Sequence, residues 1–117
     1  MQKDRRKFMR FDIPLDVEFK PSIDADSHCK GTTVNFSRSG LCFETKEHDC
    51  NLSDLLELKV KLPKKDDYIS VTGELAWKEK FDDSRCLAGI SFREIDSEAK
   101  SHILDHAYDS WLLNFRR

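Results

Sequence analysis

The sequence predicts a mainly β protein, an antiparallel barrel or sandwich of six short strands followed by one C-terminal α-helix. Three observations support this prediction. Apolar and polar residues alternate with a period of two in six segments between residues 12 and 92, as they do in half-buried strands. Turn-rich stretches separate these segments. After residue 95 the apolar residues recur every four positions, which is typical of an amphipathic helix.

Length and composition favour a single domain. The chain has 117 residues, of which 38% are apolar and 36% charged, and a chain of this length buries enough surface for one core. We expect one domain over residues 1–117, divided into an arm (1–11), a β region (12–95) and a helix (96–115). No apolar run approaches the ~20 residues of a membrane span, and no signal-peptide pattern follows the N-terminus. The sequence therefore predicts a cytoplasmic protein without membrane insertion.

The first strand is expected over residues 12–20. Its apolar residues alternate with polar ones, and they are Ile13, Leu15, Val17 and Phe19. Pro14 has no N–H to donate to a ladder, which predicts that the strand starts at a sheet edge or has one free side there. Residues 21–28 are polar and turn-rich, and we expect them to form a loop.

The second and third strands are expected over residues 32–37 and 41–46, joined by a tight turn at residues 38–40. In the second strand we expect Val34 and Phe36 to point inward. Asn35 and Ser37 then share the outer face as a small hydrogen-bonding platform. Gly40 permits the positive φ that such a turn often requires.

Three more strands and the helix complete the predicted fold. The strands are expected over residues 56–62, 69–77 and 86–92. Asp96 or Ser97 can cap the helix by accepting a hydrogen bond from a free N–H of its first turn. The helix carries a wide apolar stripe, which predicts that it either closes the barrel mouth or packs against a second copy. The stripe includes Ala99, Ile103, Ala107, Trp111 and Phe115.

Positive charge is concentrated at the N-terminus. Residues 1–10 contain five basic residues and one acidic residue, Asp4, which gives a local charge of +4. Because the net charge of the chain is −2, the remaining residues carry −6. The basic residues are Lys3, Arg5, Arg6, Lys7 and Arg10. DNA binding normally requires a larger basic surface than ten residues on an otherwise acidic domain. The pattern therefore favours a small anionic ligand, with solvation of a basic terminus as the alternative.

Two motifs contain the candidate binding residues. Arg6 and Arg10 form an R-x-x-x-R immediately before the first strand, and the planar fork of arginine matches both phosphate oxygens and the O6/N7 edge of guanine. Asn35, Ser37 and Gly40 form an N-x-S-x-x-G at a strand end and the turn after it. Turn chemistry alone also accounts for this second motif.

Together the motifs resemble the signature of the PilZ family, bacterial receptors for cyclic di-GMP, in which R-x-x-x-R is followed some 20 to 30 residues later by [D/N]-x-S-x-x-G. The resemblance extends to the segments at residues 73–77 and 88–92 and to the closing helix. It implies a six-stranded antiparallel β-barrel with a C-terminal helix. It also implies a ligand held between the arm and the outer face of the barrel.

The resemblance assigns roles to individual residues. Arg6 and Arg10 match the two arginines that grip guanine edges and phosphates. Asn35, Ser37 and Gly40 match the second motif, and Asn35 stands where Asp is also common, so it keeps a carbonyl acceptor for a guanine N–H but lacks the carboxylate charge. The residues implied to bind cyclic di-GMP are Arg6, Arg10, Asn35, Ser37 and Gly40, with Arg5 and Arg38 close enough to add charge.

Partners are predicted only in part. The arm is the element that we expect to change conformation on binding and so to relay the signal to a downstream protein, which the sequence does not name. A stacked dimer of the nucleotide would present more negative charge than Arg6 and Arg10 neutralise, and Arg5 is the nearest further cation. A homodimer through the C-terminal helix is a further hypothesis. No DNA partner, metal or other cofactor is expected.

Two alternatives belong to other functional classes. An enzyme is disfavoured, because His102 and His106 lie four apart on the helix without the glutamate of H-E-x-x-H or an evident third ligand. The cysteines have no C-x-x-C spacing, and we interpret them as free thiols. A protein–protein adaptor that keeps the barrel but binds no nucleotide is the other alternative. A titration with cyclic di-GMP discriminates among the three.

Overall fold

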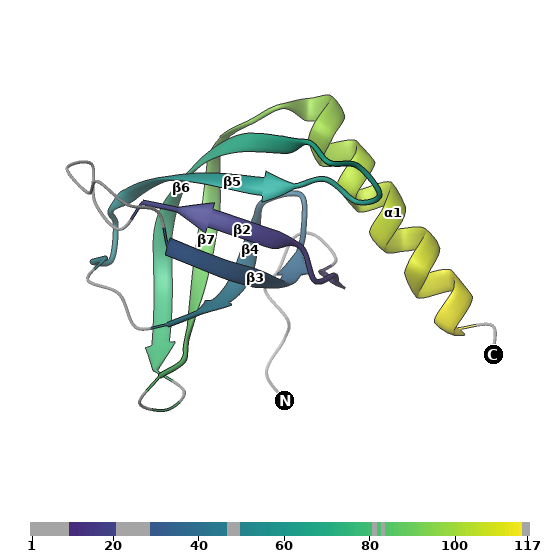
Figure 1. The fold of residues 1–117 in the computed structure, drawn as a ribbon. Helices are drawn as coiled ribbons and strands as arrows, with labels where there is room; N and C mark the ends of the chain where they lie inside the picture. The colour runs from purple at the N-terminus through teal and green to yellow at the C-terminus, as the bar shows by residue number, and fades with distance from the viewer. Residues whose placement is uncertain (1–9, 21–28, 47–49, 81, 83, 116–117) are drawn as a thin grey trace, which may run out of the picture.

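The structure is a computed structural model that describes residues 10–20, 29–46, 50–80, 82 and 84–115. The chain forms seven strands and one helix among these residues (Figure 1). They are β1 (Phe11–Asp12), β2 (Asp16–Phe19), β3 (Cys29–Phe36), β4 (Gly40–Thr45), β5 (Leu55–Lys61), β6 (Tyr68–Lys80), β7 (Cys86–Ile95) and α1 (Ser97–Phe115). Residues 1–9 of the predicted arm (1–11) lie outside the described residues.

The strands close into a barrel in which every pairing is antiparallel. β2, β3, β4, β7, β6 and β5 pair in a ring, and β1 continues the line of β2 along β3. β1 and β2 therefore act as one interrupted strand. This arrangement confirms the six-stranded antiparallel β-barrel with a C-terminal helix, and it excludes the sandwich.

The first predicted strand is interrupted at Pro14. Proline cannot donate a backbone hydrogen bond. In the gap between β1 and β2, a side chain of β3 therefore makes the hydrogen bonds that the backbone ladder with β3 lacks. The hydroxyl of Thr33 donates to the carbonyl of Ile13 and accepts a hydrogen bond from the N–H of Leu15 at 2.7 Å. The interruption divides the predicted 12–20 strand into the short β1 and β2.

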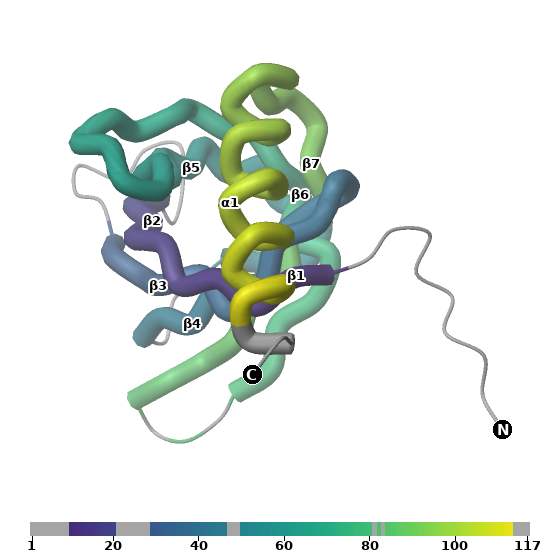
Figure 2. Tube along the Cα trace, turned by 90° about the vertical axis from the view of Figure 1, so that its right-hand side faces the viewer, coloured from purple at the N-terminus to yellow at the C-terminus, as the bar shows by residue number. Residues whose placement is uncertain are grey.

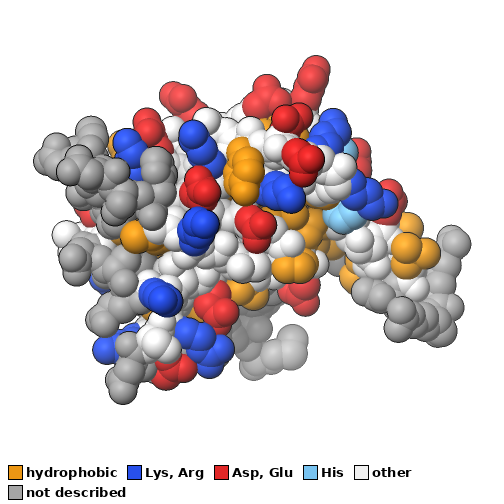
Figure 3. Space-filling view, in the orientation of Figure 1, with side chains coloured by type: hydrophobic (Ala, Val, Ile, Leu, Met, Phe, Trp, Pro, Cys, Tyr) orange, Lys and Arg blue, Asp and Glu red, His pale blue; other side chains and the backbone are white. Residues whose placement is uncertain are grey.

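The barrel interior is the hydrophobic core. Its largest fully buried side chains come from five different strands and from α1, and Phe19 packs against Phe43 with ring centroids 5.0 Å apart. On the outer face, residues of opposite charge stand opposite one another across strands, as Glu18 does with Lys30 and with Lys59. Figure 3 shows acidic and basic side chains interspersed over this face. Such cross-strand pairs stabilise neighbouring strands modestly.

Helix α1 lies across one open end of the barrel (Figure 2). Asp96 caps it by accepting a hydrogen bond from the N–H of Ala99 at 2.9 Å, as predicted. Ala99, Ile103 and Ala107 are buried, but Trp111, the next member of the predicted stripe, is 39% exposed. The helix therefore closes the barrel with its first half. No helix among the described residues has the length and hydropathy of a membrane span.

Candidate ligand-binding site

The two sequence motifs meet on the outer face of the barrel, where Arg10 lies beside Asn35. The Nη1 of Arg10 donates a hydrogen bond to the Oδ1 of Asn35 at 3.2 Å, and both residues are half-buried. β1 brings them together because Asp12 pairs with Asn35 on β3, so the residue that leads into β1 passes over the end of β3. A guanidinium held by a neutral amide keeps its full charge and most of its N–H donors for a ligand.

Val34 does not point inward as predicted. The β3–β4 ladder shifts register between Thr33 and Asn35, and such a bulge places two residues opposite one and re-aims the side chains beside it. Thr33 is buried in place of Val34, which is 40% exposed. The bulge is why a strict period of two fails for this strand.

Ser37 is buried inside the turn and does not share an outer platform with Asn35. Its backbone N–H donates to the carbonyl of Gly40 at 2.8 Å, and its hydroxyl donates to the same carbonyl at 3.3 Å. The hydroxyl also accepts a hydrogen bond from the N–H of Ser39 at 3.3 Å. The prediction of an exposed Ser37 is therefore wrong, because the turn needs the hydroxyl to satisfy its own backbone.

Gly40 is required by close packing and not by its backbone dihedral. No glycine of the described chain has a positive φ, so the predicted left-handed conformation is absent at Gly40. A Cβ at this position would lie 2.1 Å from the backbone carbonyl oxygen of Ile90 on β7. Only glycine allows β4 to approach β7 this closely where the two strands begin to pair.

A cavity of about 140 Å³ opens beside these motifs. Arg10, Ser39 and Gly40 line one part of it, and Trp77 and Gly89 line another. An enclosed cavity of about 150 Å³ accepts a benzene ring, so this open one is about the size of one aromatic ring. A cation, a serine hydroxyl and an indole around such a space can accommodate the edge or face of an aromatic, anionic ligand.

Trp77 is the lining residue that the sequence interpretation did not single out. It is 39% exposed, and its indole lies directly on Gly89, where an added Cβ would meet Nε1 at 2.0 Å. Register pairs Trp77 with Gly89 across β6 and β7. A glycine within a strand pattern is a known signal of a close approach, but the partner follows only from the strand order.

Cys42 lies between the two halves of the site. It pairs with Asn35 on one side and with Gly89 on the other, and Gly89 pairs with Trp77, so one row of residues crosses from β3 to β6. Burial raises the pKa of the Cys42 thiol, and the charge of Arg10 lowers it by less. The thiol is therefore neutral at pH 7 and adds no negative charge near Arg10.

The other predicted site residues differ in how they are placed. Arg38 is exposed in the turn, and its backbone carbonyl accepts a hydrogen bond from the Nζ of Lys100 on α1 at 3.3 Å. Arg5 and Arg6 lie outside the described residues. Within the described part of the chain, no group of three or more His, Cys, Asp or Glu side chains could hold a metal ion.

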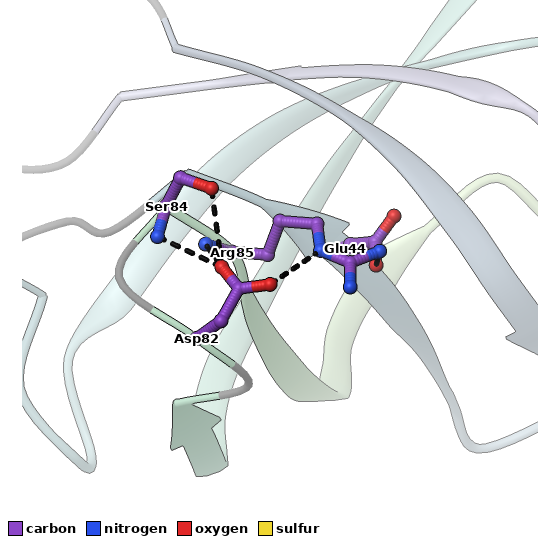
Figure 4. Close-up of polar contacts among 4 residues, drawn as sticks. All are labelled: Glu44, Asp82, Ser84 and Arg85. Carbon is purple, nitrogen blue, oxygen red and sulfur yellow. Dashed lines mark hydrogen bonds and ion pairs between the residues drawn. The ribbon is translucent and has the colours of Figure 1, made fainter.

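A second polar cluster lies at the turn between β6 and β7 (Figure 4). The backbone N–H of Ser84 and the guanidinium of Arg85 lower the pKa of Asp82 to about 2. Arg85 also forms an ion pair with Glu44 at 3.4 Å. This cluster shapes a turn, since the Asp82 carboxylate accepts the backbone hydrogen bonds of Ser84 and Arg85 at 2.9 and 3.0 Å.

Solved structures with the same fold include two bound to a cyclic dinucleotide. The structure of Bacillus subtilis inhibitor of motility (MotI/DgrA) aligns with a TM-score of 0.77 at 20% identity, covering 98% of this chain and 55% of that one. The PilZ domain of Escherichia coli YcgR with c-di-GMP gives 0.71 at 10% identity and covers 91% of both chains. The K. pneumonia MrkH–c-di-GMP complex gives 0.71 at 14% identity, covering 97% of this chain and 56% of that one.

This chain therefore spans little more than half the length of MotI/DgrA and MrkH. At these identities the matches show the fold. Among curated protein sequences none matches the chain. The family model for the PilZ domain, however, matches residues 4–109, nearly the whole sequence. The chain belongs to the PilZ domain family.

Proposed function

We propose that the chain is a receptor for cyclic di-GMP that binds the nucleotide between the N-terminal arginine arm and the outer face of the barrel. The observation that carries the proposal is the hydrogen bond between Arg10 and Asn35 beside the cavity that Trp77 lines. It joins the last arginine of one motif to the first residue of the other. Family membership supports the ligand class, and we assign no enzymatic reaction to the chain.

The chemistry of the site suits this ligand. Cyclic di-GMP carries two phosphates and two guanines, and arginine forks bind both groups. Each bidentate arginine–guanine pair contributes about 1–3 kcal/mol, and stacking on an aromatic ring adds a similar amount. Arg10 with Arg6 and an exposed indole at Trp77 could together supply much of the roughly −8 kcal/mol of a micromolar complex. Action in the bacterial cytoplasm stays a prediction.

Calorimetric titration of the whole chain with cyclic di-GMP at low salt tests the proposal. We expect saturable heat with a dissociation constant in the micromolar range or tighter, and no release of hydrolysis products. Guanosine monophosphate, with one phosphate and one guanine, is the matched control ligand and should bind far more weakly. No heat at about 100 μM cyclic di-GMP would overturn the receptor proposal.

Stoichiometry is a separate part of the proposal. A stacked nucleotide dimer would present four phosphates and four guanines, and we assign the second nucleotide to Arg5. Two nucleotides per chain are then expected for the wild type and one for Arg5→Leu. If the wild type binds one nucleotide per chain, or if Arg5→Leu still binds two, then Arg5 does not hold a second nucleotide.

A protein–protein adaptor without nucleotide binding is the second candidate. The match to MotI/DgrA, which is described as an inhibitor of motility, is compatible with it. Exposed apolar side chains on the second half of α1 also favour it, because such surfaces commonly serve protein contacts. They are Tyr108, Trp111 and Leu113. A homodimer through α1 would cover the same surface, and sedimentation with and without cyclic di-GMP tests for it.

A further inference from the structure

A candidate binding residue and a packing residue lie next to each other where the chain enters β1. Arg10 immediately precedes the strand and lies on the outer face, where it bonds to Asn35. Phe11 is its neighbour, and successive residues of an extended segment point to opposite sides. Phe11 is accordingly half-buried and packs against the core cluster. A displacement of Arg10 along or across the strand must therefore also move the ring of Phe11.

The ring of Phe11 contacts helix α1. It meets Tyr108 edge-on, with centroids 6.1 Å apart and an interplanar angle of 89°. Tyr108 in turn stacks on Trp111, with centroids 5.8 Å apart and an angle of 30°. Figure 2 shows β1 passing behind the C-terminal half of α1. Both contacts have geometries that aromatic pairs prefer, so their strength depends on the orientation of each ring.

We propose that Tyr108 positions Arg10 through Phe11, and that ligand bound at Arg10 in turn changes the packing of the exposed Tyr108–Trp111 pair. The proposal rests on the proposed function, because it takes cyclic di-GMP as the ligand. Tyr108 is a positioning residue in this scheme. It acts on the ligand only through the residue next to Arg10.

The helix is built so that this part can move without disturbing the barrel. Ala99, Ile103 and Ala107 hold its first half in the core, whereas Tyr108 is 46% exposed and Trp111 39%. Segments with few buried apolar contacts rearrange at low cost in free energy. A change in ring packing beyond Ala107 therefore leaves the core intact.

The first half of the helix also contacts the site. The Nζ of Lys100 donates to the carbonyl of Arg38, in the turn of the second motif. α1 thus contacts the turn of the second motif near its own N-terminus, and near its middle it contacts Phe11, the residue that follows the first motif. The hydrogen bond from Lys100 holds the start of the helix near the turn. A shift of β1 would therefore move Phe11 relative to Tyr108.

Thermodynamic linkage makes the proposal testable from either end. If ligand binding alters the contact between Phe11 and Tyr108, then removing the Tyr108 ring must in turn change ligand affinity. The ligand can shift the equilibrium between two arrangements of the Tyr108–Trp111 pair only if it binds more tightly to the protein in one of them. A residue that merely stabilises the helix would change the melting temperature and leave ligand affinity unchanged.

The first experiment measures tryptophan emission during a cyclic di-GMP titration of the whole chain, with calorimetry on the same samples. Trp77 lines the cavity, so it contributes to the signal of the wild type. Trp111→Phe removes the reporter on α1 and keeps an aromatic ring. We expect wild type and variant to bind equally by calorimetry, and part of the emission change to be lost in the variant.

The second experiment compares affinities of helix variants. Tyr108→Leu removes the ring that contacts Phe11, and we expect the dissociation constant to rise about five-fold. Tyr108→Phe keeps the ring and should restore wild-type affinity. Leu113→Ala is the control, because Leu113 lies on the same helix and is 71% exposed. It should leave affinity within two-fold of wild type.

The outcomes separate this inference from the proposed function. No calorimetric heat with the wild type overturns the receptor proposal and the coupling with it. Binding with identical emission changes in wild type and Trp111→Phe overturns the coupling alone. So does a Tyr108→Leu variant that binds within two-fold of wild type, provided that its circular dichroism shows an intact fold.

Discussion

The two sides of the barrel wall differ in regularity. β5 and β6 pair without interruption, from Leu55 opposite Glu74 to Lys61 opposite Tyr68, and β5 alternates between buried and exposed side chains along its length. The β3–β4 and β6–β7 ladders instead shift register at three places. Every one of these shifts lies in a ladder that borders the candidate site.

The difference indicates that the two sides of the sheet have different roles, one in stability and the other in ligand binding. A regular ladder satisfies the backbone and buries one face, which is what stability requires. A bulge re-aims a side chain at a cost in pairing. Two of the three shifts adjoin Asn35 and Trp77, which contact Arg10 and line the cavity, respectively. We infer that the regular β5–β6 side holds the barrel together and that the irregular side, whose central β4–β7 ladder is itself regular, provides the binding surface.

Gly40→Val should have the largest effect, because it inserts a branched side chain where β4 meets β7. Its Cβ would lie 2.1 Å from the backbone oxygen of Ile90, which cannot rotate away. We expect a loss of about 3 kcal/mol or more in the free energy of unfolding. Ligand affinity should fall as well, since Gly40 lines the cavity. Urea denaturation and calorimetry measure the two effects.

Leu58→Ala is the matched substitution on the regular side. Leu58 is fully buried on β5, so truncation should cost about 2–5 kcal/mol of stability. Ligand affinity of the folded fraction should stay at the wild-type value. A Leu58→Ala variant that is folded but binds weakly would contradict the division between the two sides.

Arg10→Ala should reverse that pattern. The substitution removes a half-buried guanidinium that donates a hydrogen bond to the neutral amide of Asn35, so stability should change by less than about 1 kcal/mol. Cyclic di-GMP affinity should fall at least ten-fold, which corresponds to about 1.4 kcal/mol. The same loss is expected for Arg6→Ala. Calorimetry at two salt concentrations measures the affinity. Wild-type affinity in Arg10→Ala would show that the arm does not contact the ligand.

Much of the fold follows from periodicity because one face of most strands is buried. Alternation placed β5 within one residue of its observed start and end, since its two faces differ in solvent exposure over the whole length. It failed at Val34, because a bulge adds a residue and reverses the faces. It also overextended the first strand across Pro14, where the side chain of Thr33 replaces the ladder. Both failures depend on a partner strand.

The site was predictable only where a motif lies in contiguous sequence. The spacing of the second motif located Asn35, Ser37 and Gly40, but the spacing does not say that Ser37 turns inward to bond the carbonyl of Gly40. Trp77 belongs to the cavity because strand order brings β6 beside β7. A register between strands more than ten residues apart cannot be read from either strand alone.

Ser37→Ala should affect stability more than binding, which separates a turn residue from a ligand residue on the same irregular side. The hydroxyl of Ser37 is buried and accepts a hydrogen bond from the N–H of Ser39. Its loss should cost about 1 kcal/mol. Cyclic di-GMP affinity should fall less than three-fold, because the backbone bond from Ser37 to Gly40 remains. Thermal melts and calorimetry test this, and a ten-fold loss of affinity would place the hydroxyl on the ligand.

The smallest effect is expected at Asp82, in the turn that joins β6 to β7 away from the cavity. Its pKa lies at about 2 in the folded chain, below the usual 3.8. The unfolded chain therefore binds a proton there more readily, and stability rises with pH between about 2 and 4. The contribution of this carboxylate is complete above about pH 4 and is lost as the pH falls towards 2.

Asp82→Asn removes the titrating group and keeps one oxygen for the hydrogen bonds that Asp82 accepts in the turn. The melting temperature of the variant should lie slightly below that of wild type at pH 6, and the gap should close as the pH falls from 4 to 2. Because the carboxylate is exposed, added salt should narrow the gap at pH 6. Cyclic di-GMP affinity at pH 7 should not change. A gap that widens on acidification would mean that Asp82 binds its proton more tightly in the folded chain than in the unfolded one, contrary to the hydrogen bonds that hold it.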